Sequence, residues 1–341
     1  MGRTFPVGKL DAKLLAKLIK KYYRKNKALI VPPKIGEDAA VIKENAKYLV
    51  LTTDPITLAK GEVGLYSVII NANDIASMGG EPKWFLSANL LPEGKTTKAD
   101  VESLFKNISQ VCQDLGILWI GGHIEITSGL KRPIVVGEMI GTVKRDKITP
   151  SSNSRIDDDL LLVKGIAIEG TAIIAREKEK YLKRRFSSSF LERAKNFLIK
   201  PGISILKEAL LANNSVRINA MHDPTEGGLS TGIMEVAQAS EKGVLVFFEQ
   251  IKIYDEAKIL CKEFSLDPLG LIASGSLLIS LNPEESPKLI KLFQRKGIPI
   301  SIIGKIKKKD FGFKMKVNGK IKKLPKFKVD EITKIYRRKT R

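Results

Sequence analysis

The chain has little cysteine and little histidine, with two of each among 341 residues. This scarcity excludes a disulfide-rich scaffold and a zinc site built from closely spaced Cys and His ligands. Cys112 and Cys261 both lie in segments whose apolar residues have helical spacing. That setting is typical of reduced thiols that pack in a core. Neither cysteine is therefore expected to be catalytic.

Long apolar runs are also missing. No stretch of about 18 apolar residues occurs, which is the length that a membrane-spanning helix needs. The N-terminus lacks the apolar core of a signal peptide. We therefore expect no membrane contact and a cytoplasmic location. Because 43% of the residues are hydrophobic, a chain of this length can bury a sizeable core, and we expect two domains.

Acidic residues are in the minority, with 37 Asp and Glu against 59 Lys and Arg. Residues 305–341 hold 16 Lys or Arg against 3 acids. This surplus of 13 positive charges is more than half of the formal net charge of +22. Such a basic tail could contact RNA, polyphosphate or an acidic protein. It carries no zinc-finger spacing, no RNA-binding signature and few aromatic residues for base stacking. We favour a solvated, lysine-rich surface and do not expect nucleic acid as a partner.

Three acidic junctions stand out against this basic background. The first contains Glu37 and Asp38, the second Asp54, and the third Asn71, Asp74 and Gly79. Taken singly, each acid is typical of a helix cap or a turn. Together they favour a site for phosphate and a divalent cation, because Mg²⁺ takes oxygen ligands, usually one or two carboxylates plus water and phosphate. Asn71 and Asp74 are three residues apart in an expected helix at 64–78 and would share one of its faces.

Paired glycines mark a second feature of the N-terminal half. Gly121 and Gly122 follow residues 117–120, which we expect to form a buried strand. Glycine lets a backbone approach a ligand closely, and His123 and Glu125 then alternate onto one face of the strand. A histidine at a strand end can be structural or can contact a ligand, so both roles stay open for His123.

The C-terminal half has two loops that lead into expected helices. One is Gly165–Thr171, which could present backbone amides to an anion or could be a tight turn. The other is Met221–Leu229, before an expected helix at 230–240. Its candidate residues are His222, Thr225, Glu226, Gly227 and Gly228. A cap and turn explain only part of this set, so we interpret the loop as facing a ligand, with His222 as a candidate proton carrier.

A hydrophilic stretch at residues 144–159 separates the two halves and is typical of a domain junction. We therefore predict a domain at residues 1–148 and a second at residues 149–341, with the basic tail from about residue 305. Strand-like and helix-like segments are interspersed in both halves, as in a mixed α/β protein.

The motifs together resemble those of the aminoimidazole ribonucleotide (AIR) synthetase superfamily, whose members include PurM, HypE and thiamine-monophosphate kinase. Gly36–Ile42 is similar to the opening Gly-Asp-Asp-Ala motif of this family, with Glu37 in place of the first Asp. Thr53–Asp54, Asn73–Gly80 and Gly121–Gly122 follow in the order of the family, and His222–Leu229 resembles its second-domain motif. The resemblance covers nearly the whole chain and points to the AIR synthase-related branch.

The resemblance implies a two-domain α/β, PurM-like fold whose N-terminal, mainly β-sheet domain forms a homodimer with ATP bound nearby. It implies an Mg²⁺- and ATP-dependent enzyme, of ligase or phosphotransferase type, that phosphorylates or activates an oxygen of a small-molecule or protein-borne acceptor. A small-molecule kinase, and a nucleotide-binding regulatory protein without turnover, remain alternatives. The implied metal ligands are Asp38, Asp54 and Asp74, and the implied cofactor contacts are Glu37, Asp38, Asp54, Asn71, Asp74, Gly79, Gly121, Gly122, His123, Gly227 and Gly228. The second-domain loop that carries His222, Thr225 and Glu226 would face the acceptor and supply the catalytic residues.

Two departures from the family pattern bear on these expectations. His123 stands where relatives often place a metal-binding acid, so Glu125 is a candidate to replace that ligand. HypE ends in a cysteine that carries the group being dehydrated, whereas no cysteine follows Cys261 here. We therefore expect the acceptor to be a separate molecule.

Overall fold

The structure, a computed structural model, describes residue 5 and residues 8–57 and 62–337. It divides into two compact units. The six-stranded unit comprises residues 26–32 and 38–148, and the seven-stranded unit comprises residues 1–25, 33–37 and 149–341. Residues 8–25 thus belong to the unit formed by the C-terminal half, which the linear pattern of the sequence did not indicate. Among the described residues, no helix has both the length and the apolar character needed to cross a membrane.

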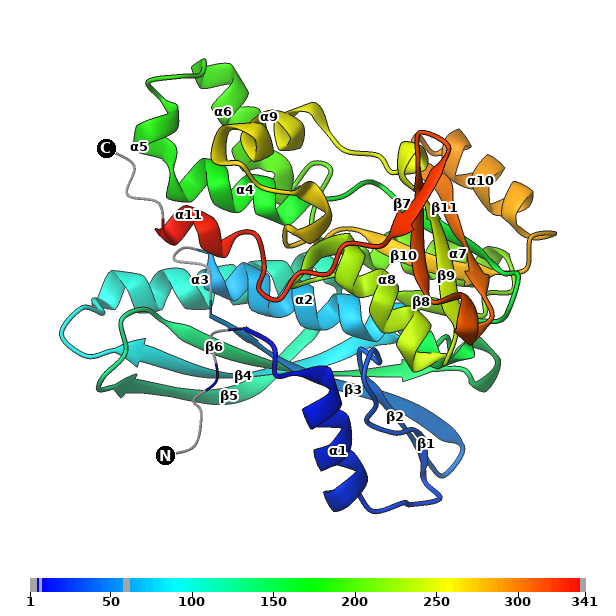
Figure 1. Ribbon diagram of the computed structural model, residues 1–341. Helices are drawn as coiled ribbons and strands as arrows, with labels where there is room; N and C mark the ends of the chain where they lie inside the picture. Colours follow the sequence, from blue (N-terminus) through cyan, green and yellow to red (C-terminus); the bar gives the residue numbers. More distant parts are fainter. Residues whose placement is uncertain (1–4, 6–7, 58–61, 338–341) are drawn as a thin grey trace. The chain divides into compact units, whose positions relative to one another are not determined.

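The six-stranded unit contains one mixed sheet with the strand order β1-β2-β3-β6-β4-β5. Its strands are β1 (Leu29–Val31), β2 (Ala40–Glu44), β3 (Lys47–Ile56), β4 (Glu81–Pro92), β5 (Leu118–Thr127) and β6 (Ile134–Val143). Only the β4–β5 pair is parallel. Two helices, α2 (Val63–Ser77) and α3 (Lys98–Leu115), lie along the sheet, with α2 against β3, β6 and β4 (Figure 1).

Helix α2 is the central element of this unit, because fourteen of its fifteen residues are buried. A helix that is buried all round is normally apolar, yet Asn71, Asn73 and Asp74 lie inside with the apolar residues. Helix α3 is an amphipathic cover with clear end signals. Thr97 and Asp100 form a capping box at its start, and Gly116 ends it in a left-handed conformation. The helix expected at residues 64–78 is confirmed as α2, with bounds that differ by one residue at each end.

The seven-stranded unit has the strand order β13-β12-β9-β11-β7-β10-β8. Its strands are β7 (Asp159–Val163), β8 (Ala220–His222), β9 (Gly243–Phe247), β10 (Leu277–Leu281), β11 (Ile300–Lys307), β12 (Phe313–Val317) and β13 (Lys320–Lys323). Its helices are α1 (Ala12–Tyr22), α4 (Ile168–Glu177), α5 (Glu179–Leu182), α6 (Ser188–Lys195), α7 (Leu206–Ser215), α8 (Gly228–Ala239), α9 (Asp255–Phe264), α10 (Ser286–Arg295) and α11 (Thr333–Arg337). The expected α/β class is confirmed by the mixed sheet and helices of each unit.

The main core of this unit lies between the sheet and α8. Leu229 and Ile233 of α8 pack in one cluster with Leu160 and Leu162 of β7 and with Val246 of β9. Full burial of each such side chain contributes about 1.5–3 kcal/mol. The packing fixes α8, and with it the loop that precedes the helix.

Two local expectations need correction. The strand expected to be buried at 117–120 is buried only at Ile117: residues 118–120 belong to β5 at the edge of the sheet, where Leu118 is 62% exposed. The basic segment from residue 305 is folded through most of its described length, because it supplies part of β11, then β12 and β13, and the buried residues Ile332 and Ile335.

Candidate functional site

Two of the predicted acids come together between β3, α2 and the segment before β2. Asp74 of α2 is buried, and its Oδ2 accepts a hydrogen bond from the Thr52 hydroxyl at 2.7 Å. The same hydroxyl oxygen lies 3.2 Å from the carbonyl oxygen of Asp38. The Oδ2 of Asp38 accepts from the Ser77 hydroxyl at 2.7 Å. Thr52 therefore links two carboxylate residues that are far apart in the sequence.

Asp54 is held in this part of the unit by Asn71. The Asn71 side chain is fully buried; its Oδ1 accepts from the backbone N–H of Asp54 at 2.9 Å, and its Nδ2 donates to the carbonyl of Ser67 at 2.8 Å. The amide of Asn71 thus fastens β3 to α2. Asn71 positions Asp54, while the ligand contact predicted for Asn71 stays a prediction.

Glu125 does not join these acids within the unit. It lies on β5, which is separated from β3 by β6 and β4. Three strand spacings of about 4.8 Å place it roughly 14 Å away. Over the described ranges 8–57 and 62–337, no group of three or more His, Cys, Asp or Glu side chains is close enough to hold a metal ion. The structure therefore does not assemble the four-carboxylate metal set, and it brings together only Asp38 and Asp74.

Gly122 of β5 has a structural reason. Gly122 has φ +144°, and a Cβ atom there would lie 2.0 Å from the carbonyl oxygen of Ser87 on β4. Close approach of the neighbouring strand thus requires glycine at this position. Beyond it, His123 and Glu125 are exposed, with 3.8 Å between Nε2 and Oε2. Gly79, also predicted to contact the cofactor, has φ +82° just after α2 and donates its N–H to Ala76.

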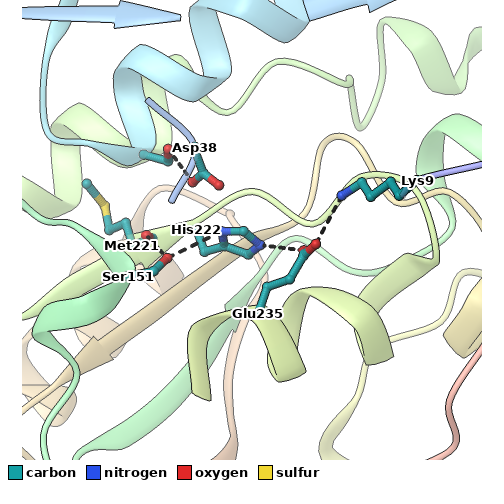
Figure 2. Close-up of polar contacts among 7 residues, drawn as sticks. Lys9, Asp38, Ser151, Met221, His222 and Glu235 are labelled. Carbon is teal, nitrogen blue, oxygen red and sulfur yellow. Dashed lines mark hydrogen bonds and ion pairs between the residues drawn. The ribbon is translucent and has the colours of Figure 1, made fainter. Parts of the chain in front are cut away.

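In the seven-stranded unit, His222 ends β8 and is held through both ring nitrogens (Figure 2). Its Nδ1 lies 3.4 Å from Ser151 Oγ, and its Nε2 lies 3.3 Å from Glu235 Oε2. Lys9 donates to the other oxygen of Glu235 at 3.1 Å. Although burial opposes the charged form, Lys9 and His222 lower the pKa of Glu235 to about 2. The resulting carboxylate fixes the orientation of the His222 ring.

The loop before α8 is fastened at several points. Gly227 adopts φ +81° at the start of the helix and donates its N–H to Asp330 at 2.7 Å. A Cβ on Gly228 would lie 2.5 Å from the carbonyl oxygen of Leu269. The Thr225 carbonyl accepts from the N–H groups of Gly228 at 3.1 Å and of Ala273 at 3.3 Å. Thr225 and Glu226 are half-buried, so this rigid loop presents them at the start of α8.

Glu37 and Asp38 have different surroundings although they are adjacent. The two carboxylate oxygens of Glu37 accept the backbone N–H groups of Ser151 and Ser152, each at 2.9 Å. Glu37 thus caps the 3-10 turn Ser151–Asn153 in the seven-stranded unit. The cofactor contact predicted for Glu37 stays a prediction, and the structure gives its carboxylate a capping role.

Sequence reasoning missed three residues of these networks: Ser151, Glu235 and Asp330. No local motif marks Glu235, which is one acid in a helix, or Asp330, which lies 103 residues from the glycine that it binds. Only the folded chain shows that these acids are buried and paired with distant groups.

Two family models match the chain. The N-terminal domain of AIR synthase related proteins matches residues 36–143, and the C-terminal domain of the same proteins matches residues 155–316. Together they cover well over half of the chain.

Curated relatives and solved structures agree with these matches. The chain is 27% identical over 263 residues to a putative hydrogenase expression/formation protein of Methanocaldococcus jannaschii, covering 76% of this chain and 75% of the relative. It is 24% identical over 265 residues to thiamine-monophosphate kinase of Aquifex aeolicus, covering 74% and 81%. A crystal structure of the hydrogenase maturation protein HypE in complex with ATP superposes with a TM-score of 0.67 at 18% identity, covering 96% of this chain and 97% of HypE. That likeness shows the shared fold.

Proposed function

Because the chain belongs to the AIR synthase-related family, we propose that it is an Mg²⁺- and ATP-dependent enzyme that activates an oxygen of an acceptor by phosphorylation. The acceptor is a small molecule or a group on another protein. The observation that carries the proposal is the polar cluster beside α2, where the Thr52 hydroxyl lies between the carboxylate of buried Asp74 and the backbone carbonyl of half-buried Asp38. A buried carboxylate such as that of Asp74 costs stability, and a bound cation would offset this cost.

The donors in this region fit magnesium. Asp38, Asp54 and Asp74 offer only hard oxygen ligands, and the hydroxyls of Thr52 and Ser77 orient two of the carboxylates. Mg²⁺ is usually held by one or two protein carboxylates, with phosphate oxygens and water as the other ligands. A site without three preassembled acids is therefore compatible with Mg²⁺ that arrives with ATP. When bound, the ion neutralises the charge of the phosphates.

Neither cysteine of the chain is suited to carry the acceptor. Cys112 and Cys261 are 2% and 3% exposed. Burial raises the pKa of each thiol to about 12, so neither forms the nucleophilic thiolate near neutral pH. We propose that the acceptor binds as a separate molecule at the loop of Thr225–Gly228.

Product analysis with purified protein tests this function. With Mg²⁺ and ATP, we expect ADP to form only when an acceptor is added, from a panel of amide-bearing small molecules and thiamine monophosphate. Phosphorus NMR then distinguishes two outcomes: a stable phosphorylated product identifies a small-molecule kinase, whereas free phosphate with a changed acceptor identifies activation and displacement. Cys261→Ser should retain the turnover of the unmodified protein. ATP binding without turnover on any acceptor would favour a regulatory nucleotide-binding protein instead.

We also propose a homodimer formed by the six-stranded unit. Strand β5 is an unpaired edge of the sheet that exposes Leu118 at 62% and Ile126 at 56%, and Trp84 on the neighbouring β4 is 37% exposed. Exposed apolar edge strands are sites of association unless another chain covers them. A two-fold pairing that covers β5 would bury these side chains.

Light scattering tests the dimer. The chain has a mass of 37.7 kDa, so we expect twice this mass at micromolar concentration. Leu118→Glu or Ile126→Glu should shift the protein to the monomer. Ile259→Glu is the matched control, because Ile259 is 41% exposed but lies on α9 of the other unit. A monomer for the unmodified protein would contradict the proposal.

A further inference from the structure

Glu169 is a buried acid that no part of the proposed site yet uses. It lies in the first turn of α4, is 5% exposed, and its Oε2 atom has no hydrogen-bond partner among the described residues. Leaving a buried polar atom without a partner costs about 1–3 kcal/mol, and burying an ionised carboxylate costs more. A glutamine or an apolar side chain would avoid the second cost. The position therefore carries an acid at the expense of stability.

The charged groups that face Glu169 make ionisation still less favourable. They are Glu226, in the loop before α8, and Asp330, in the segment before α11. Burial raises the pKa of Glu169 to about 7; contact with Ser274 acts in the opposite direction, and the two neighbouring acids raise the pKa further. Asp330 is itself fixed by the N–H groups of Gly227 at 2.7 Å and Ile272 at 3.2 Å. Glu169 thus lies beside the loop that carries Thr225 and Glu226.

The backbone that delivers Glu169 is strained. Lys164 and Ala167 lie in the loop between β7 and α4, and both have left-handed conformations, with φ +67° and +60°. Such conformations cost of order 1–3 kcal/mol each in residues other than glycine and cluster at functional sites. Gly165 accepts a hydrogen bond from Ser276 at 2.7 Å, which holds this loop against the segment after Ser274. The fold therefore holds an unfavourable acid in one defined place.

We propose that Glu169 is the group that accepts the proton lost by the acceptor during phosphorylation, and this inference rests on the proposed function. As the γ-phosphorus of ATP bonds to the acceptor oxygen, the bond from that phosphorus to the departing ADP oxygen breaks. The acceptor's proton passes to the Glu169 carboxylate and later leaves to water. His222 is less suited to this task, because Ser151 and Glu235 hold both of its ring nitrogens. A proton acceptor is most effective when its pKa lies near the working pH.

Glu169→Gln tests the inference, with Glu284→Gln on the exposed surface as the matched control. Loss of a general base reduces turnover by about 100-fold to 10,000-fold, so we expect kcat to fall at least about 100-fold. In the unmodified protein, kcat should rise with pH through about 7, and this limb of the profile should disappear in Glu169→Gln. The control should keep the unmodified kcat and profile.

Thermal unfolding provides a readout that does not need turnover. The unfolded-state pKa of Glu169 is about 4.5 and its folded-state pKa about 7, so the native state binds more protons between these values. This contribution to stability is complete below pH 4.5 and is lost as pH rises through 7. The Tm of Glu169→Gln minus that of the unmodified protein should therefore increase from pH 5 to pH 8. Burial raises the pKa of Asp330 to about 6, so the Tm of Glu169→Gln should still fall with pH, but less steeply than the Tm of the unmodified protein.

The outcomes separate this inference from the function on which it rests. If the unmodified protein turns over ATP with an acceptor and Glu169→Gln has the same kcat and pH profile, the role of Glu169 is wrong and the proposed function stands. A Tm difference that does not change with pH would also overturn it, because Glu169 would then titrate as in the unfolded chain. If the unmodified protein transfers no phosphoryl group to any acceptor, the proposed function fails, and the proton role fails with it.

Discussion

Replacing Asp74 by Asn is expected to weaken Mg²⁺-dependent ATP binding by more than about 10-fold. The substitution keeps the size of the side chain and its hydrogen bond with Thr52, but it removes the charge that would bind the cation. Loss of a group that only orients a metal ligand already costs about 10-fold to 100-fold. Calorimetric titration of ATP, with Mg²⁺ and with EDTA, measures the effect. We expect Asp54→Ala to weaken Mg²⁺-dependent ATP binding as well.

Asp114→Asn is the matched control for Asp74→Asn. Asp114 belongs to α3 of the same unit, is exposed, and accepts a hydrogen bond from Gln110. Its replacement removes one negative charge at a distance from the proposed site, so affinity should be unchanged. Equal affinity for ATP in EDTA and in Mg²⁺, or undiminished binding by both Asp74→Asn and Asp54→Ala, would show that these acids do not form the site.

Gly122→Ala is expected to lower the free energy of unfolding by more than about 3 kcal/mol. The new Cβ would lie 2.0 Å from the Ser87 carbonyl oxygen, and φ is +144°, where side chains are rarely tolerated. The contact involves main chain on both sides, so β4 and β5 must separate to relieve it. Denaturant unfolding followed by circular dichroism measures the change. Losses of stability this large usually have a specific cause, such as a steric clash or backbone strain.

Gly94→Ala is a control that distinguishes the steric clash expected in Gly122→Ala from the cost of a side chain at positive φ. Gly94 also has a positive φ, +70°, but a Cβ there would meet no heavy atom within 4 Å. We expect a loss of about 1–2 kcal/mol, the cost of a left-handed conformation alone. If both variants lost the same stability, the close approach of β5 to β4 would be of no energetic consequence. Gly122 would then need another explanation.

Much of the architecture was predictable from local signals. Thr97 and Gly116 mark the two ends of α3, and both are local sequence signals. The apolar residues of α2 likewise lie in the segment that forms the helix. The order of the motifs from Gly36 to Leu229 predicted the AIR synthase-related family, which the matches over residues 36–143 and 155–316 confirm. These signals operate over a few residues, or as an ordered series along the chain, and so can be read without a structure.

The tertiary structure decided which candidate residues lie together. It brought Asp38 to Asp74 through Thr52 and used Asn71 to position Asp54, but it placed Glu125 at the far edge of the sheet. The local sequence does not distinguish an acid on β5 from an acid on β3. The order of the strands in the sheet decides which of them lies near Asp74. It also exposed the apolar residues of β5, which the sequence pattern had indicated to be buried.

By itself, the sequence determined the family, the mixed α/β class and the segments that carry the acidic and glycine-rich motifs. Only the tertiary structure decided that His222 is held by Glu235, that Gly227 is bound by Asp330, and that Glu169 is buried. The physical reason is that hydrogen bonding and burial depend on what surrounds a side chain in space. For these residues the surroundings come from segments more than 100 positions away, and no local pattern contains that information.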